Sequence, residues 1–407
     1  MSKEVLYLSY DGMTDPLGQS QVLPYLVGLT QKGYQFTLVS CEKKERYFQN
    51  KKIIEQICTE NNINWHPIFY TKKPPVLSTI WDIIKLNKKV KQLHQKKQFQ
   101  LIHCRSYIPS LIGSGFKKKH GVKFLFDMRG FWADERVDGN IWDIKKLHYK
   151  WIYNYFKKKE KEFLSRADKI ISLTENGKEE MLSWNILNLF EQKIEVIPCA
   201  ADYDLFELVT LEKREKAKLD LGLNPSQFVL SYIGSLGTWY MADEMLHFFS
   251  ILKRKLSNAK FLFLTPDSKK MIINLAKKYN LNEADFIFKF SSRKDLPHLA
   301  HASDFSIFFI KPVYSKKSSS PTKMGELMAM GIPLICNANV GDVDLIMNKV
   351  NAGFCLATLD SSSYEKIIPR LENWRENTLE NIRENSKQFY DLKNGLNLYT
   401  ALYDQLL

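Results

Sequence analysis

The sequence SSSPTKMGELMAMGIP at residues 318–333 decides the fold of the second half of the chain. Ser320 suits the N-cap of a helix and Pro321 suits its first position. Apolar residues recur three and four positions apart from Met324 onward, which predicts a helix with one buried face. Gly331 ends that helix, and the apolar run after it predicts a buried strand. The stretch is therefore a loop, a short helix and a strand.

The start of this helix is suited to an anion. Its first N–H groups lack partners within the helix, and the helix dipole adds positive charge at the same end. Lys323 and Glu326 are three positions apart and share a face, so one ligand could contact an ammonium and a carboxylate. The alternative is an ordinary Lys–Glu pair on the surface of an amphipathic helix.

The pattern SPTKxxExxAxGxP resembles the donor-binding signature of the retaining glycosyltransferases of family 4, which have the GT-B fold. The resemblance implies that Lys323 lies beside the pyrophosphate of a nucleotide-sugar, and that Glu326 binds the ribose. It also implies donor contacts from Ser320 and Thr322. Ser318 stands where the family usually has a glutamate that contacts the transferred sugar.

Length and composition predict a soluble protein of two domains. The chain has 407 residues, 44% of them hydrophobic, and no apolar run long enough to cross a membrane. Its start lacks the apolar region of a signal peptide, so we expect a cytoplasmic protein. The six cysteines are scattered and predict buried thiols, and no cluster of acidic residues predicts a metal site.

The net charge of +14 is concentrated in the first half. Residues 1–200 hold 33 Lys and Arg against 21 Asp and Glu, and the rest of the chain holds 26 against 24. A basic half indicates an anionic partner, which could be a nucleic acid, an acidic membrane or a phosphorylated substrate. A solvated, lysine-rich surface is the alternative.

The first half begins as a nucleotide-binding fold does. A buried strand at 5–9 leads into a loop with Asp11 and Gly18, and a helix is expected at about 20–32. Gly18 would let the backbone approach a ligand. This unit resembles the first βαβ unit of the family. We assign Gly18 to the donor and Asp11 to the acceptor.

Two further strand ends carry charged candidates. The strand at 101–103 is followed by Arg105, which we favour over His103 as a site residue, because ligands bind at carboxyl ends of parallel strands. After the strand at 124–126 come Asp127, Arg129 and Asp134 among aromatic residues. This run resembles a loop of a family subgroup in which a histidine faces the sugar, and Arg129 takes its place. Asp127 and Arg129 could equally form a structural ion pair.

Residues 141–165 alternate aromatic residues and lysines at helical spacing. One interpretation is a long helix packed on the sheet with a solvated face. The other is a basic, aromatic surface at an anionic bilayer, as a lipid-linked acceptor would require.

The second half again alternates strands and helices, which predicts a parallel sheet. The fold class is therefore α/β, with two facing Rossmann-like domains and a cleft between them, as in GT-B proteins. We expect an acceptor domain at 1–203, a donor domain at 204–384, and a last helix at about 385–407 that returns to the first domain. The loop GSLGTWYMADE resembles the family's phosphate loop but lacks its Arg and Lys, since Ser235 follows Gly234 there. Arg293 lies at the end of a later strand, where the family binds the base.

These features predict a retaining, metal-independent glycosyltransferase without a cofactor, which uses a UDP- or GDP-linked sugar. Lys323, Arg129 and Asp127 are the catalytic candidates. Asp11, Arg105 and Asp134 are the acceptor candidates. We expect a lipid-linked or polysaccharide acceptor, peripheral contact with the inner face of the plasma membrane, and no nucleic acid. The alternatives are a sugar-nucleotide epimerase of the same fold and, less favoured, a nucleic-acid-binding protein.

Overall fold

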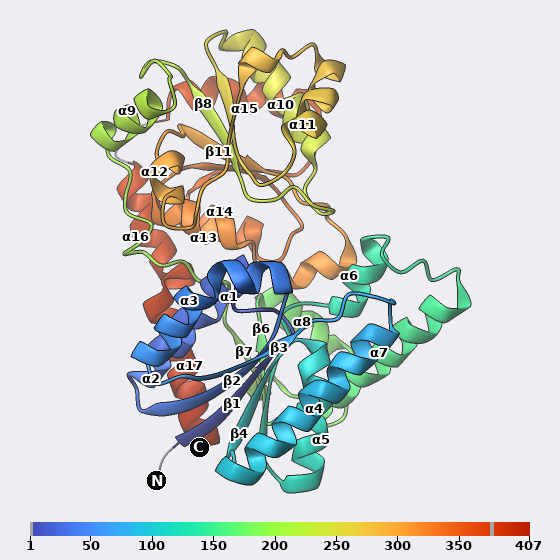
Figure 1. The fold of residues 1–407 in the computed structure, drawn as a ribbon. Coiled ribbons are helices and arrows are strands. Elements are labelled where there is room, and N and C mark those ends of the chain that lie inside the picture. The colour runs from blue at the N-terminus through green and yellow to red at the C-terminus, as the bar shows by residue number, and fades with distance from the viewer. Residues whose placement is uncertain (1–2, 375–377) are drawn as a thin grey trace. The chain divides into compact units, whose positions relative to one another are not determined.

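The computed structural model describes residues 3–374 and 378–407 as two compact units (Figure 1). Unit 1 comprises the residues up to Pro198 together with Leu392–Leu407, and unit 2 comprises Cys199–Asp391. The chain therefore leaves unit 1, forms unit 2 and returns to unit 1 with its last helix.

Unit 1 is a parallel sheet of seven strands in the order β3-β2-β1-β4-β5-β6-β7, with helices on its faces. The strands are β1 Lys3–Ser9, β2 Tyr34–Glu42, β3 Asn64–Phe69, β4 Leu101–Arg105, β5 Lys123–Asp127, β6 Lys169–Ser172 and β7 Ile194–Val196. The helices are α1 Pro16–Gln21, α2 Leu23–Thr30, α3 Lys44–Glu60, α4 Leu77–Lys97, α5 Tyr107–His120, α6 Trp132–Asp138, α7 Leu147–Arg166, α8 Glu175–Ser183 and α17 Leu392–Leu406.

Unit 2 is a parallel sheet of six strands in the order β10-β9-β8-β11-β12-β13. The strands are β8 Val229–Ile233, β9 Lys260–Leu264, β10 Phe286–Lys289, β11 Phe305–Phe308, β12 Leu334–Asn337 and β13 Gly353–Leu356. The helices are α9 Leu211–Asp220, α10 Ala242–Lys255, α11 Lys269–Ala276, α12 Leu296–Ala300, α13 Thr322–Ala329, α14 Val343–Val350, α15 Ser361–Glu372 and α16 Thr378–Tyr390.

Both sheets reverse their strand order once, and the reversal determines where a ligand can bind. In unit 1 the order changes between β1 and β4, and in unit 2 it changes between β8 and β11. At such a point the loops leave the sheet in opposite directions and open a crevice outside the carboxyl ends of the strands. The predicted fold class of two parallel α/β sheets is confirmed.

Two expected helices are broken by their sequence. The helix expected at 20–32 is divided at Val22, where α1 ends and α2 begins, and Pro24 occupies the first turn of α2. Proline has no N–H to donate within a helix, but it is accepted in a first turn, which accounts for this division. The last helix is likewise divided at Asp391, which separates α16 from α17. The predicted end of α13 is confirmed, since Gly331 follows it with φ +74.

Helix α17 completes the core of unit 1. Leu396 lies against Gly28 on α2 so closely that a Cβ on that glycine would come within 2.5 Å of the leucine side chain. The hydroxyl of Tyr403 bonds the ring Nδ1 of His103 on β4 at 2.7 Å. The last helix is thus a structural part of the unit whose strands precede it by hundreds of residues.

Candidate functional site

The predicted start of α13 is wrong by one position. The helix begins at Thr322, and its N-cap is Pro321, which has extended backbone angles and no side chain that can accept a hydrogen bond. Ser320 therefore does not cap the helix. Its Oγ instead accepts a hydrogen bond from the backbone N–H of Cys199 at 3.1 Å, at the residue where unit 2 begins. The serine links the motif to the start of its own unit.

Lys323 is a buried cation held by aromatic rings. Its side chain is 8% exposed, and its Nζ lies 4.0 Å from the ring centroid of Tyr232 and 3.6 Å from that of Tyr240. Nζ has no hydrogen-bond partner among the residues that the structure describes. Burial lowers the pKa of Lys323 well below its usual value, although the carboxylates of Glu326 and Asp267 act in the opposite direction. Such a group has unused donors for an anion.

The ammonium faces the loop that follows β8 at the reversal point of unit 2. Gly234 has φ +100, and a Cβ added there would lie 3.5 Å from Nζ of Lys323, so the loop backbone runs beside the cation. Asp267, after β9, fixes this loop. Its carboxylate accepts the hydroxyl of Ser235 at 3.1 Å and the backbone N–H of Leu236 at 2.5 Å.

The aromatic rings are positioned by pairing between two chain segments. Tyr240 forms an antiparallel bridge with Ile310, just beyond β11, and the N–H of Lys311 donates to the carbonyl of Trp239 at 3.0 Å. The loop after β8 is thereby drawn across to the adjacent strand. The cage that the rings of Tyr232 and Tyr240 form around Lys323 was not predicted from the sequence, although the dipeptide Trp-Tyr in that loop was a signal for it.

Glu326 lies one turn beyond Lys323 on α13 and is paired with a distant arginine. The NH1 of Arg293 donates to Oε1 of Glu326 at 2.6 Å. Burial raises the pKa of Glu326, and the positive charges of Arg293 and Lys323 oppose that shift. The structure therefore brings three of the predicted residues together, because the loop after β10 reaches the face of α13.

Ser318, where the resemblance led us to expect a glutamate, lies in a 3-10 turn at Tyr314–Ser318. Its side chain is buried, and its Oγ donates to the carbonyl of Ser315 at 3.2 Å. The hydroxyl stabilises the turn that precedes α13.

In unit 1, Asp127 is buried at the carboxyl end of β5 among three basic side chains. Its carboxylate lies 3.6 Å from NH1 of Arg105, 3.7 Å from NH1 of Arg129 and 3.7 Å from Nε2 of His103. Burial alone would raise the pKa of Asp127, but Arg129, His103 and Arg105 outweigh it and hold the pKa below its usual value. Asp127 is therefore an ionised carboxylate, as the predicted ion pair with Arg129 would require.

The polar groups of this cluster lie slightly too far apart to hydrogen-bond directly. In the described part of the chain, neither oxygen of Asp127 has a hydrogen-bond partner, and Nε and NH1 of Arg105 have none either. Asp11 is the outermost member, with its Oδ2 3.5 Å from Nε of Arg105. Separations of this length are spanned by a bridging water or by the polar groups of a ligand. Asp11 and Arg105 also flank the reversal point between β1 and β4, where the fold places a crevice.

Arg129 has an unusual backbone. Its φ is +57, in the left-handed region that residues with a side chain rarely occupy, and Gly130 follows with φ +118. Such strain persists only where the surrounding structure maintains it, and it is concentrated at functional sites. The loop bends back at this point and directs Arg129 toward Asp127.

Two other predicted residues have structural partners. Asp134 accepts the hydroxyl of Tyr153 at 2.8 Å and Nζ of Lys157 at 2.9 Å, which ties α6 to α7. Gly18 lies in α1, where a Cβ would come 2.3 Å from the carbonyl oxygen of Gly12. Because Gly18 has no side chain, α1 can pack closely against the loop that precedes it.

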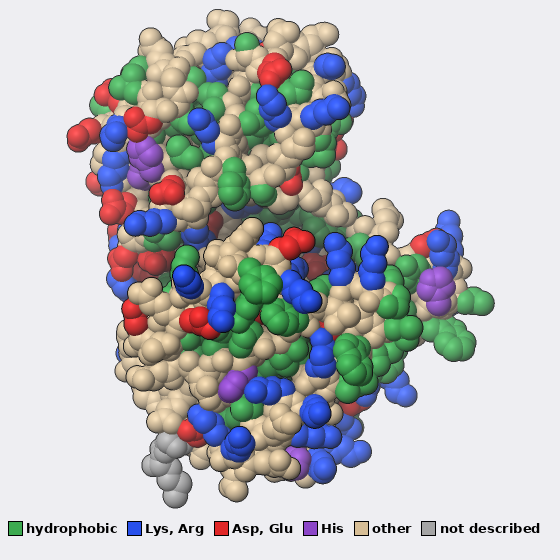
Figure 2. All heavy atoms as spheres, in the orientation of Figure 1, with side chains coloured by type: hydrophobic (Ala, Val, Ile, Leu, Met, Phe, Trp, Pro, Cys, Tyr) green, Lys and Arg blue, Asp and Glu red, His purple; other side chains and the backbone are tan. Residues whose placement is uncertain are grey.

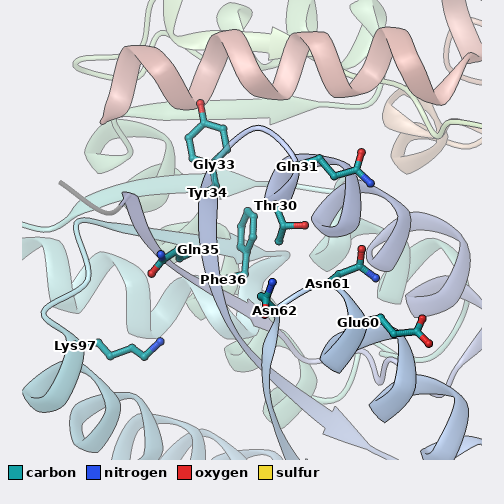
Figure 3. A pocket seen from close by; sticks show the side chains of 10 residues that line it. All are labelled: Thr30, Gln31, Gly33, Tyr34, Gln35, Phe36, Glu60, Asn61, Asn62 and Lys97. Atoms are coloured by element: carbon teal, nitrogen blue, oxygen red, sulfur yellow. The ribbon is translucent and has the colours of Figure 1, made fainter.

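A pocket opens at the opposite end of the unit 1 sheet, near the start of β2 (Figure 3). Its volume is about 690 Å³, and Tyr34, Glu60, Asn62 and Lys97 are among its lining residues. None of the predicted site residues lines it. Within residues 3–374 and 378–407, no group of three or more His, Cys, Asp or Glu could hold a metal, and no helix is long and apolar enough to cross a membrane.

Two family models match the chain, and together they span most of it. The model described as Glycosyltransferase Family 4 matches residues 21–205, and the one described as Glycosyl transferases group 1 matches residues 213–389. None of the curated proteins matches the sequence significantly.

Several solved structures share the fold at low sequence identity. Sucrose-phosphate synthase from Thermosynechococcus elongatus superposes with a TM-score of 0.75 at 16% identity, over 99% of both chains. HepE from Anabaena, in complex with UDP and glucose, has a TM-score of 0.70 at 13% identity, over 100% of this chain and 99% of its own. WaaG, a glycosyltransferase involved in lipopolysaccharide biosynthesis, has a TM-score of 0.68 at 13% identity, over 99% of both chains. These likenesses establish the GT-B fold.

Proposed function

We propose, because the chain belongs to the family 4 glycosyltransferases, that it transfers a sugar from a nucleoside-diphosphate donor to a lipid-linked or polysaccharide acceptor. The anomeric carbon exchanges its bond to the diphosphate for a bond to an acceptor hydroxyl, with retention of configuration. HepE is described in complexes with UDP and with UDP-glucose, which supports a uridine or a related nucleotide as the donor.

The observation that carries this proposal is the buried ammonium of Lys323. It lies beside the backbone of Gly234 at the reversal point of unit 2, and its donors are unused in the described structure. A departing diphosphate gains negative charge, and a fixed cation in a site of low dielectric stabilises that charge strongly. Lys323 therefore serves in place of a metal ion as the stabilising positive charge. Ser235 and Thr322 contribute hydroxyls to the same region.

Glu326 and Arg293 form the second part of the donor site. A carboxylate accepts hydrogen bonds from both hydroxyls of a ribose, and the bond from Arg293 fixes its orientation before the nucleotide arrives. Because Arg293 occupies Oε1, Oε2 of Glu326 remains to accept hydrogen bonds from the ribose. In the family that the sequence resembles, an Arg and a Lys of the loop after the first strand of this unit contact the diphosphate. Because this chain lacks both in that loop, we assign the contact with the diphosphate to Lys323.

Unit 1 carries the residues that we assign to binding the acceptor. Arg105, Asp127 and Arg129 form the polar cluster at the carboxyl ends of β4 and β5, and Asp11 lies at its edge. We assign them to positioning the acceptor hydroxyl and the sugar, and Asp134 to supporting the same face from α6. A basic unit 1 favours an acceptor that is presented at an anionic membrane, on its cytoplasmic side.

The test is a thermal-shift panel of UDP, GDP, dTDP, CMP and their sugars against wild type, Lys323→Met and Glu326→Gln. A ligand at about 100 times its Kd adds about 2.7 kcal/mol to stability, which is a readily measured shift. We expect one nucleotide class to stabilise wild type and to stabilise Lys323→Met much less. Lys366→Met is the matched control, because this exposed lysine on α15 lies in the same unit.

The proposal fails if no nucleotide stabilises wild type, or if Lys323→Met responds as wild type does. Transfer to polyprenyl-linked and soluble oligosaccharide acceptors is then assayed with the donor that the panel identifies. Conversion of the donor to an epimer without any acceptor would identify an epimerase instead.

A further inference from the structure

We propose that unit 1 docks on an anionic lipid bilayer through two apolar stripes flanked by lysines, on α4 and α7. The α4 stripe consists of Leu77, Ile80, Trp81 and Ile84, and the α7 stripe consists of Leu147, Trp151 and Tyr155. The inference deepens the proposed function, since it names the surface at which a lipid-linked acceptor would be met. It does not depend on transfer being observed.

Both stripes are exposed apolar surfaces with helical spacing. The members of the α4 stripe are between 48% and 64% exposed, and those of the α7 stripe are between 48% and 75% exposed. Residues three and four positions apart lie on one face of a helix, so each stripe is continuous along its helix. Contiguous apolar surface of this kind marks an interaction site rather than an ordinary protein surface.

The exposure of the α4 stripe is fixed by the opposite face of the helix. That face buries Asp82, whose carboxylate accepts the hydroxyl of Tyr10 at 3.1 Å, the N–H of Thr71 at 2.9 Å and Nζ of Lys85 at 2.7 Å. Leu86 and Val90 continue the buried face. The helix therefore already has an apolar side toward the core, and the stripe is a second one that points away from it.

Helix α7 is arranged in the same way. Its buried side includes Phe156, Glu160 and Phe163, and the Glu160 carboxylate bonds Lys157 and the hydroxyl of Tyr107 on α5. Since α5 packs against both α4 and α7, the two stripes belong to one helical layer of unit 1 (Figure 1).

The positive charge of the protein coincides with these segments. Residues 43–100 hold 13 Lys and Arg against four Asp and Glu, and residues 141–165 hold seven against three. These two segments thus carry +13 of the net charge of +14, although they make up only about a fifth of the chain. Figure 2 shows basic and hydrophobic side chains interspersed over the face of unit 1 that α3 and α4 form.

Charge and apolarity together select a bilayer as the occupant. A nucleic acid would match the lysines but would leave Leu77, Ile84 and Leu147 facing a phosphate backbone. A second copy of the chain would bury the apolar stripes but would bring two strongly positive surfaces together, which repel. An anionic bilayer satisfies both features, because aromatic and aliphatic side chains enter the interface while lysines remain at the headgroups.

The experiment measures sedimentation of the full chain with vesicles of phosphatidylcholine and of phosphatidylglycerol. We expect binding to the anionic vesicles alone, with loss at high salt. The apolar variant Trp81→Ser/Ile84→Ser should reduce binding about tenfold or more. The charge variant Lys88→Gln/Lys91→Gln should reduce it about fivefold per lysine. Leu345→Ser changes an exposed leucine of unit 2 and serves as the matched control.

Equal binding to both kinds of vesicle, no binding to either, or unchanged binding by the apolar variant would overturn the inference. So would RNA binding without vesicle binding, or a dimer that dissociates in the apolar variant. The nucleotide thermal shift is measured on the same variants. If it is retained while vesicle binding is lost, the two proposals are separated, and if no nucleotide binds wild type, vesicle binding still tests this surface.

Discussion

The two units each bury a charge at the carboxyl ends of their strands, and they do so in opposite ways. In unit 1, Asp127 is surrounded by Arg105, Arg129 and His103, and the pKa of the carboxyl is held low, so that the charged form is favoured. In unit 2, Lys323 is surrounded by the rings of Tyr232 and Tyr240, and its pKa is lowered, so that the charged form is disfavoured. The first charge is compensated by charged side chains around it, whereas the second is compensated only in part, by two aromatic rings and by the carboxylates of Glu326 and Asp267.

This difference separates a group that stabilises the fold from one that is retained at a cost in stability. A buried ion with partners becomes destabilising when a partner is removed, because the remaining charges are left uncompensated. A buried ion whose loss of hydration is only partly compensated lowers stability as it stands and is kept where its function requires it. The comparison therefore predicts that substitutions in the two units change stability in opposite directions.

The largest expected effect is that of Asp127→Asn on stability. The substitution removes the charge of the buried carboxylate that faces both Arg105 and Arg129, and we expect the free energy of unfolding to fall by about 3–5 kcal/mol. The low folded pKa of Asp127 contributes stability that is present above the unfolded pKa of about 3.9 and is lost as the pH falls below it. The free energies of unfolding of wild type and Asp127→Asn, measured with a denaturant, should therefore become equal as the solution is made acidic. Equal stability at neutral pH would contradict the comparison.

The second effect concerns ligand binding by Lys323→Met. Methionine fills the space between the two rings without a charge, and we expect the binding of a nucleoside diphosphate to weaken by about 10- to 100-fold, since a hydrogen bond to a charged group contributes about 1.5–3 kcal/mol. Isothermal titration with the nucleotide from the thermal panel measures this loss. The nucleoside without phosphate is the control ligand, and it should bind both proteins alike.

A third, smaller effect tests the ion pair of Glu326 and Arg293. Glu326→Gln keeps the shape but loses the charge, and a hydrogen bond to a charged group is worth about 1.5–3 kcal/mol, so affinity should fall about tenfold or more. The loss should be much smaller with the 2′,3′-dideoxy nucleotide, which has no ribose hydroxyls to bind. An equal loss with both ligands would place Glu326 elsewhere in the site.

The smallest expected effect is on the stability and pH dependence that Lys323 confers. Because its folded pKa is lowered, ionisation destabilises the folded protein below the unfolded pKa of about 10.4. Lys323→Met should therefore raise the Tm at neutral pH by about 2–4 °C for each kcal/mol relieved. The Tm of wild type should approach that of the variant as the pH rises. Nucleotide binding should also take up a proton, so the affinity for the nucleotide should increase as the pH falls from the alkaline range.

The fold was predictable because its signals are local and repeated. Alternating strands and helices predicted both parallel sheets, and the motif of Lys323 and Glu326 was placed on one helical face, where the structure has it. The start of α13 was mispredicted because the side chain of Ser320 accepts a hydrogen bond from the N–H of Cys199, which is more than a hundred residues away in the sequence. The cage of Tyr240 and the bond from Arg293 to Glu326 were missed for the same reason. They depend on which loops meet at adjacent strand ends, which spacing does not reveal.

The division of unit 1 into two segments of the chain has a consequence for its synthesis. The ribosome makes β1 to β7 first, then all of unit 2, and only after unit 2 α17 with Tyr399 and Tyr403, which cover His103. Domains that are continuous in sequence can fold as they emerge. Unit 1 therefore lacks α17 until all of unit 2 has been made, whereas unit 2 is continuous in sequence and can fold before unit 1 is complete. Cutting the gene between the units would yield a first fragment that lacks part of its own core.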